Sequence, residues 1–408
     1  MDREAKRRNF IIITLTLAIM SPFSSATNVY FSLFVLELGG TIVDVGLINL
    51  TSLLTLAFSR LIGGYLADTL GRKRVIAPMT ILYALSNFFF VIASDWRFLL
   101  IGSFMSSLAL MYQPALMAFV GDILPEEKRG SGISIMSAPS QLLNLVGPPL
   151  ATLLVSKLGL ERGMKVLFTL VVISTLASGF LRFFLIETYC VQSKPSLTHA
   201  IRDYRNALKV LRGKLGRLMI ITSSASGIYN MAYPYVQIHA VKNLGLSLEF
   251  WGWISTLVAF ISTISLLVSG ILSDKIGRNL TLALGYFSGL AGLLMISLAP
   301  KGDTAYFATA MVVNVMFSSS PPAQAMLVDL TKEEVRGKVN AVSGLLEGSL
   351  AGTMSAAGGI LYSVFGPFLF TLASLLLIPV VMGSIKLPKK VESEGRENSS
   401  IAFTEWSD

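Results

Sequence analysis

Apolar runs long enough to cross a bilayer recur along almost the whole chain of 408 residues. A helix needs about 20 mostly apolar residues to span the hydrocarbon core. Windows of about 19 residues predict helices over 10–37, 44–67, 74–94, 98–121, 131–156, 164–187, 217–241, 250–272, 279–299, 304–328, 337–362 and 367–386. We therefore predict an all-α membrane protein with twelve transmembrane helices.

The distribution of charge fixes the predicted orientation. Only 14% of the residues are charged, against roughly 25% in soluble domains. Most of the 33 lysines and arginines fall in loops that share one side of the predicted membrane. By the positive-inside rule this side is the cytoplasm, and both termini lie there. The net charge of +9 then reflects topology in the plasma membrane, and no nucleic-acid partner is expected.

Enzyme and metal chemistry find little support in the sequence. Cys190 is the only cysteine, and His199 and His239 stand far apart. This excludes an intrachain disulfide and fits no metal-ligand spacing. No phosphate-binding loop for ATP is present either. We expect no catalytic residues, no metal and no cofactor.

A polar stretch divides the chain in two. The predicted domains are an N-terminal six-helix bundle at 1–188 and a C-terminal one at 217–388. Residues 189–216 are basic with apolar residues at helical spacing, which predicts an amphipathic helix on the cytoplasmic surface. Residues 389–408 are polar and are predicted to form a disordered cytoplasmic tail.

The two halves contain the same motifs. "GGYLADTLGRKR" is echoed by "SGILSDKIGRNL", so that Gly64, Asp68, Gly71 and Arg72 match Gly270, Asp274, Gly277 and Arg278, each 206 residues later. "GDILPEEKRG" is echoed by "VDLTKEEVRG", so that Asp122 and Arg129 match Asp329 and Arg336, each 207 residues later. A common offset for separate motifs indicates tandem duplication of a six-helix unit. An even number of helices per unit gives both copies the same orientation.

These motifs resemble those of the major facilitator superfamily. "GYLADTLGRKR" is similar to that family's inner-loop signature, with Thr69 in place of the usual cation. "DILPEEKRG" resembles its loop between helices 4 and 5. The resemblance implies two parallel six-helix bundles that alternate between inward- and outward-facing states. It is weaker in helix 5, where only Gly147 and Pro148 match an exporter motif. Ser103 stands where proton-coupled exporters have an arginine.

The resemblance also implies an inner gate. Asp68 at the end of one helix can pair with Arg72 across the glycine turn or meet a helix of the other half. Asp122 with Arg129, and Asp329 with Arg336, are further candidate pairs. The alternative is that the cations only anchor topology. The predicted gating set is Gly64, Asp68, Gly71, Arg72, Lys73, Asp122, Arg129, Gly270, Asp274, Gly277, Arg278, Asp329 and Arg336.

Arg60, Arg182 and Glu347 fall inside predicted spans, where charged residues are rare and usually functional. Arg60 and Glu347 lie at similar depth on helices 2 and 11, which face each other in the family. We predict an ion pair between the halves that protonation of Glu347 or substrate releases. Alternatively, Arg60 extends to the inner surface and Glu347 contacts a hydroxyl such as that of Ser343. Arg182 is expected to snorkel.

The family resemblance assigns the cavity lining to helices 1, 4, 7 and 10. Their polar and aromatic residues form a neutral, amide-rich set, which could instead serve hydrogen bonding between helices. The candidate substrate residues are Asn28, Tyr112, Gln113, Tyr229, Asn230, Tyr233 and Asn314.

The predicted function is secondary active transport by a rocker-switch mechanism. The expected partner is a small neutral or amphiphilic solute, with proton-coupled efflux as the first hypothesis. Uptake of a metabolite such as a sugar, by symport or uniport, is the second. A non-transporting membrane sensor is the alternative from another class. We expect a monomer in the lipid bilayer.

Overall fold

The computed structural model describes all residues except 1–2, 126–128, 189–212, 332 and 390–408, and omits the side chains of 126–130 and 332–338. Most of the predicted linker and nearly all of the predicted tail therefore lie outside the described residues. Residues 213–216, expected in the linker, begin α11 instead.

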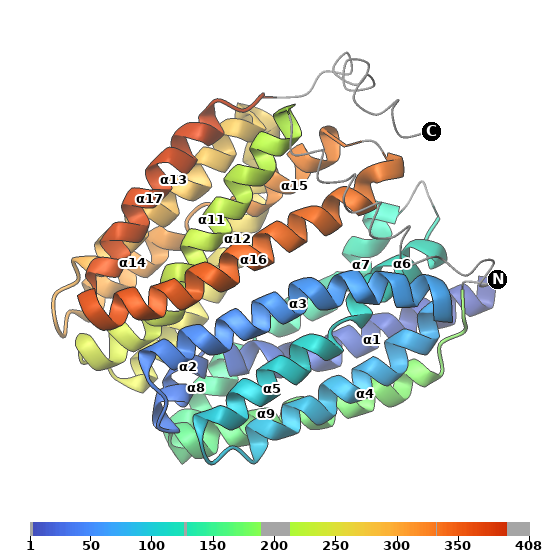
Figure 1. Ribbon diagram of the computed structural model, residues 1–408, viewed down its shortest axis with the longest axis horizontal. Helices are drawn as coiled ribbons and strands as arrows, with labels where there is room; N and C mark the ends of the chain where they lie inside the picture. Colours follow the sequence, from blue (N-terminus) through green and yellow to red (C-terminus); the bar gives the residue numbers. More distant parts are fainter. Residues whose placement is uncertain (1–2, 126–128, 189–212, 332, 390–408) are drawn as a thin grey trace.

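The described chain is helical, and its elements match the twelve predicted spans (Figure 1). The N-terminal half contains α1 (Arg3–Asn28), α2 (Phe31–Glu37), α3 (Ile42–Leu70), α4 (Arg72–Val91), α5 (Trp96–Ala109), α6 (Tyr112–Ile123), α7 (Arg129–Asn144), α8 (Gly147–Leu158) and α9 (Leu160–Phe183). The C-terminal half contains α11 (Gly213–Ile238), the π-helix η3 (His239–Asn243), α12 (Leu248–Ile276), α13 (Arg278–Ser297), α14 (Thr304–Val315), α15 (Ser320–Asp329), α16 (Glu333–Phe365) and α17 (Phe368–Ile385).

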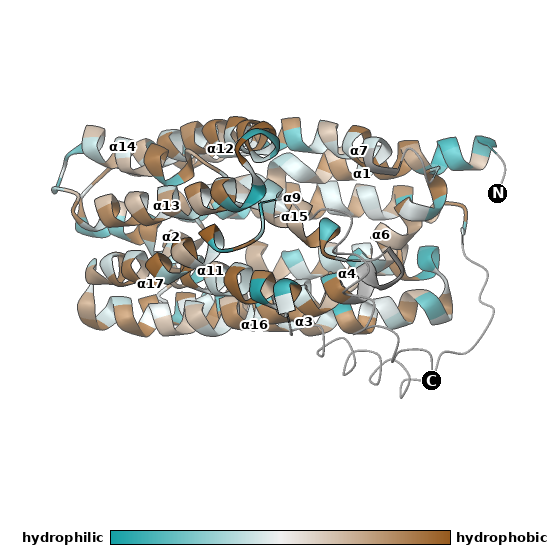
Figure 2. Ribbon diagram, turned by 90° about the horizontal axis from the view of Figure 1, so that it is seen from above, coloured by the Kyte–Doolittle hydropathy of each residue, from teal (hydrophilic) through white to brown (hydrophobic). Residues whose placement is uncertain are grey.

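Eight of the described helical segments are long and apolar enough to cross a membrane by themselves. The other four predicted spans are two interrupted ones, α7–α8 and α14–α15, and two helices rich in small and polar residues, α11 and α16. Hydrophobic residues cover the length of the bundle, and hydrophilic ones gather toward its ends, including the start of α1 (Figure 2). We call the end of the bundle that contains the start of α1 the inner face, following the positive-inside assignment.

Proline explains why several predicted spans are interrupted. Prolines occupy the first turns of α8 and α15, and Pro114 occupies that of α6. Proline lacks a backbone N–H, which costs nothing in the first turn of a helix. Neighbouring helices accommodate two of the breaks. A Cβ on Gly63 would collide with the Met111 carbonyl, whereas Ser269, 206 residues later, accepts a hydrogen bond from the Ser318 N–H at 2.9 Å.

The halves meet mainly along α3 and α16, which lie side by side through the middle of the molecule (Figure 1). Small residues on α16 let the two backbones approach closely. A Cβ on Gly348 would lie 2.9 Å from that of Ala57, and one on Gly359 would lie 3.1 Å from the Ile42 carbonyl oxygen. Because Ile42 begins α3 at the outer face, this contact runs from the outer face to the middle of the membrane.

Two hydrogen bonds join the outer ends of the halves at a second place, between the residues that connect α1 to α2 and the start of α12. The Tyr30 hydroxyl donates to the Leu248 carbonyl at 2.9 Å, and the Trp251 indole N–H donates to the Val29 carbonyl at 2.7 Å. Both aromatic side chains are buried. The outer ends of the halves are thus joined directly.

The turns between α3 and α4 and between α12 and α13 have the same glycine conformation. Gly71 has φ 94° and ψ 150°, and Gly277 has φ 104° and ψ 150°. This region of backbone space is accessible essentially only to glycine. The sequence repeat therefore corresponds to a repeated turn.

Gly71→Ala and Gly277→Ala are each expected to destabilise the protein by about 1–3 kcal/mol, because alanine is strained in this conformation. Gly64→Ala and Gly270→Ala are matched controls: they lie in the same motifs, and an added Cβ would meet nothing within 4 Å. Their effect should stay within about 0.5 kcal/mol. Thermal unfolding in detergent measures all four, and equal melting temperatures would contradict the assignment.

Candidate functional site

An arginine–aspartate pair holds the inner face of the N-terminal half. Arg72 at the start of α4 forms an ion pair with Asp122 at the end of α6, and its Nη1 donates to the Ala118 carbonyl at 2.6 Å. Asp122 also accepts a hydrogen bond from the Thr188 hydroxyl at 2.7 Å. The pair therefore links α4, α6 and the segment that follows α9.

The C-terminal half repeats this arrangement. Arg278 at the start of α13 pairs with Asp329 at the end of α15, and its Nη1 donates to the Ala325 carbonyl at 2.7 Å. The predicted ion pair of Asp68 with Arg72 is thus not formed. In each half, the arginine of the first motif pairs with the aspartate of the second motif of the same half. The side chains of Arg129 and Arg336, the other predicted partners, lie outside the described residues. Asp68 and Asp274 are exposed and form no ion pair with any described residue.

Glu187 is a part of this network that the sequence analysis missed. Its carboxylate accepts hydrogen bonds from the backbone N–H groups of Arg72 at 3.2 Å and Lys73 at 3.0 Å. A negative charge at a helix N-terminus is favourable because the helix dipole is positive there. The available signal was an acidic residue at the last position of the predicted span 164–187, next to a basic stretch.

Arg182 does not snorkel as predicted, because its side chain is fully buried. Its Nη1 donates to the Thr80 hydroxyl at 2.7 Å and its Nε to the Thr16 hydroxyl at 3.3 Å. The guanidinium lies 5.0 Å from the centre of the Tyr112 ring. Since Cα–Cβ bonds tilt toward a helix N-terminus, and α9 begins at the outer face, the side chain leaves the helix toward the membrane interior. The guanidinium therefore joins α1, α4, α6 and α9.

The predicted ion pair between Arg60 and Glu347 is not formed. The Arg60 Nε and Nη2 both donate to the Gln113 side-chain oxygen, at 3.1 and 2.9 Å. Glu347 accepts from the Ser343 hydroxyl at 3.1 Å and from that of Thr222 at 3.5 Å. The hydroxyl alternative is therefore correct for Glu347. The two residues still flank one interface, since a Cβ on Gly344, three residues before Glu347, would lie 4.0 Å from an Arg60 nitrogen.

Glu347 lies in a cavity of about 310 Å³ within the C-terminal half. The lining comes from α11, α13, α15 and α16 and combines two tyrosines with hydroxyl, amide and small apolar side chains: Leu218, Thr222, Ala225, Ser226, Tyr229, Tyr286, Ser319, Ser320, Ala323, Gln324, Leu327 and Glu347. Among the described residues that line it, Glu347 is the only charged one. Tyr286 was missed because it belongs to predicted helix 9, outside the set assigned to the cavity.

Of the seven predicted substrate residues, Tyr229 lines this cavity and the other six do not. Tyr112 and Asn314 are buried, and Asn314 donates to the Gly289 carbonyl at 3.1 Å. Asn28 and Asn230 donate to carbonyl oxygens of their own helix, at 3.1 and 2.9 Å. Gln113 is engaged by Arg60, and Tyr233 is 41% exposed.

Comparison with known proteins identifies the family. The family model described as Major Facilitator Superfamily matches residues 12–313 and 218–407. The chain belongs to the Major Facilitator Superfamily. It is thus a member of a family of membrane transporters that bind small molecules, and it is a multi-span protein of the plasma membrane.

Individual similarities within the superfamily are distant. An uncharacterised MFS-type transporter of Methanocaldococcus jannaschii is 24% identical over 392 residues, which cover 92% of this chain and 94% of that protein. The quinolone resistance protein NorA of Staphylococcus aureus is 28% identical over 113 residues, 28% of this chain and 29% of that protein. The crystal structure of a D-xylose–proton symporter has a TM-score of 0.69 at 15% identity, covering 95% of this chain and 97% of that one.

The two aspartates of the inner network should differ in their effect on stability in this superfamily member. Asp122→Asn removes the charge that faces Arg72, whose side chain is only 13% exposed. We expect it to cost about 1.5–3 kcal/mol, the range for hydrogen bonds to charged groups. Asp68→Asn, the matched control, should cost less than about 0.5 kcal/mol. Thermal unfolding compares them, and equal losses would show that Asp68 has a structural partner.

Proposed function

We propose that this chain exports a small neutral or amphiphilic solute in exchange for protons, by rocker-switch alternating access. The observation that carries the proposal is the cavity around Glu347, where tyrosines and polar groups surround a single carboxyl group. Such a lining suits an apolar or aromatic solute with a few polar groups. The partial similarity to the quinolone resistance protein NorA supports export.

Glu347 is the proposed coupling residue. Its hydrogen-bond partners among the described residues are hydroxyl groups, so a proton can bind the carboxyl group without displacing a cation from a direct ion pair. It also lies next to the interface between α3 and α16, where a change of charge affects both halves. Protonation would then favour one arrangement of the halves over the other. Arg60 lies on α3, which faces α16, and its side chain is held by Gln113 of α6. It is the proposed cation that the Glu347 carboxylate meets in the alternate state.

Glu347→Gln should reduce flux driven by a pH gradient at least tenfold and remove its pH dependence, because glutamine cannot titrate. Ser343→Ala is the control: it removes a hydrogen-bond partner of Glu347 and retains the titrating group, so pH dependence should persist. Transport by reconstituted vesicles over a range of pH measures both. Wild-type flux and pH dependence in Glu347→Gln would disprove the coupling role.

Asp68 is the proposed inner latch. The halves are joined at their outer ends through Tyr30 and Trp251, which supports an inward-facing state. Asp68 is exposed and forms no ion pair with a described residue, so it is then available to bind the opposite half when the inner side closes. Asp68→Asn should therefore slow transport several-fold while melting like the wild type. Unchanged transport in Asp68→Asn would contradict the latch.

Uptake of a sugar by proton symport is the second candidate. The overall fold is shared with a D-xylose–proton symporter, and the hydroxyl and amide groups of the cavity suit a sugar as well. Vesicles with imposed pH gradients of either sign, tested with a fluorescent amphiphilic cation and with radiolabelled xylose, distinguish the candidates. Counterflow of protons and dye supports export, and parallel flow of protons and sugar supports symport. Gradient-independent flux indicates a uniporter, and solute binding without flux indicates a sensor.

A further inference from the structure

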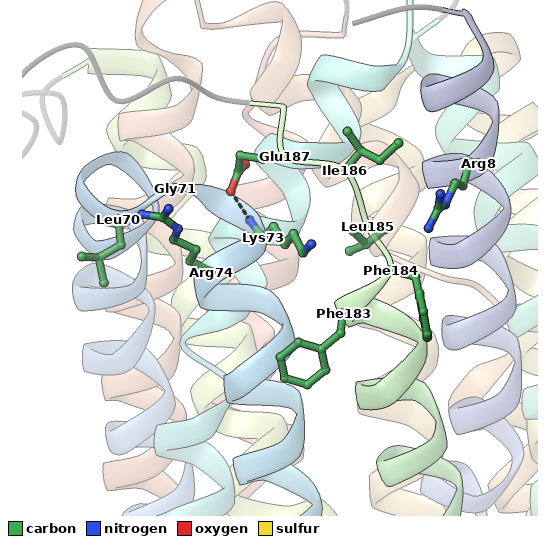
Figure 3. Close-up of a pocket in the computed structure, with 10 residues that line it drawn as sticks. All are labelled: Arg8, Leu70, Gly71, Lys73, Arg74, Phe183, Phe184, Leu185, Ile186 and Glu187. Carbon is green, nitrogen blue, oxygen red and sulfur yellow. Dashed lines mark hydrogen bonds between the residues drawn. The ribbon is translucent and has the colours of Figure 1, made fainter.

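A second cavity opens at the inner face of the N-terminal half, between the starts of α1 and α4 and the end of α9 (Figure 3). Its volume is about 840 Å³. The residues that determine its chemistry are Arg8, Lys73, Arg74, Phe183, Phe184 and Glu187. In Figure 3 the side chains of Arg8 and Lys73 extend into the gap between α1 and α4 from opposite sides. None of these residues belongs to the solute cavity around Glu347.

The charge of this cavity is not balanced. Three cationic side chains line it, and the one carboxylate, that of Glu187, is engaged by the backbone N–H groups of Arg72 and Lys73. Within the described part of the chain, no carboxylate lies within ion-pair distance of Arg8, Lys73 or Arg74. The cavity therefore presents positive charge to whatever enters it.

The apolar part of the cavity faces the membrane. Phe183 ends α9 and Phe184 follows it, and their side chains are 47% and 60% exposed. Figure 3 shows both rings below Arg8 and Lys73, farther along the helices toward the membrane interior. Cations at the inner surface with exposed aromatic rings beneath them match the two parts of a phospholipid, its charged head group and its acyl chains. Basic pockets between helices on the cytoplasmic side recognise such head groups.

We propose that this cavity binds the phosphate-bearing head group of an anionic phospholipid of the inner leaflet. Arg8 and Lys73 contact the phosphate from opposite sides, and Phe183 and Phe184 pack against the acyl chains. A soluble phosphate compound would use the cations but would leave both phenylalanines exposed, which favours the lipid. The bound lipid would connect α1 to the turn that contains Gly71 and Lys73, and so would stabilise the signature loop.

The test uses the full chain in nanodiscs of phosphatidylcholine alone and with one fifth phosphatidylglycerol. Native mass spectrometry counts retained lipids, and thermal unfolding measures stabilisation. Phosphatidylglycerol should be retained and should raise the melting temperature of the wild type. Arg8→Gln should weaken retention about fivefold, the usual effect of one basic residue at an anionic surface, and Arg8→Gln with Lys73→Gln should abolish it.

Arg7→Gln is the matched control, because it removes the same charge from the adjacent position of α1 outside the cavity. It should retain phosphatidylglycerol like the wild type, and Arg8→Lys should retain most of the binding. Equal losses in Arg7→Gln and Arg8→Gln would overturn the proposal in favour of general surface attraction. Equal stabilisation by phosphatidylcholine, or an Arg8-dependent stabilisation by inorganic phosphate alone in detergent, would overturn it as well. These readouts do not require transport.

Discussion

Each half of the protein depends on one arginine that joins the start of one helix to the end of another. Arg72 reaches Asp122 and Arg278 reaches Asp329, and each guanidinium also binds a helix carbonyl at the same place. These contacts seal helix ends at the inner face, where unsatisfied polar groups would otherwise meet the edge of the bilayer. Because Arg72 forms its ion pair with Asp122, Asp68 forms no ion pair with a described residue.

The two halves share a backbone framework but differ in their charged residues and cavities. The N-terminal half contains Arg60, Arg182 and the basic cavity at the inner face, whereas the C-terminal half contains Glu347 and the tyrosine-rich cavity. The positions that match between halves are those of turns and helix ends. The unmatched ones carry charge within the membrane. This separation is expected when duplication preserves a scaffold and each copy acquires its own chemistry.

The sequence was sufficient for the helices, the duplication and the turns, because these depend on local apolar runs and on glycine. It was insufficient where a side chain had a choice of partners. Arg72 pairs with Asp122, fifty residues later in the sequence, although Asp68 lies only four residues before it. Arg60 binds the side-chain amide of Gln113 and not a carboxylate. The direction of Arg182 follows from helix geometry, and attention to the orientation of α9 could have predicted its burial. Glu187 and Tyr286 required knowledge of tertiary contacts that one sequence does not contain.

The glycine contact between α3 and α16 has a mechanical consequence. Gly348, Gly352 and Gly359 let backbone atoms of α3 and the side chains of Leu53, Leu54 and Ala57 come close to the α16 backbone, so at these three positions no side chain of α16 protrudes toward α3. Rotation of one half against the other therefore displaces no α16 side chain at these glycine positions. The contact can therefore keep the halves together in both arrangements while adding little to the free-energy barrier between them.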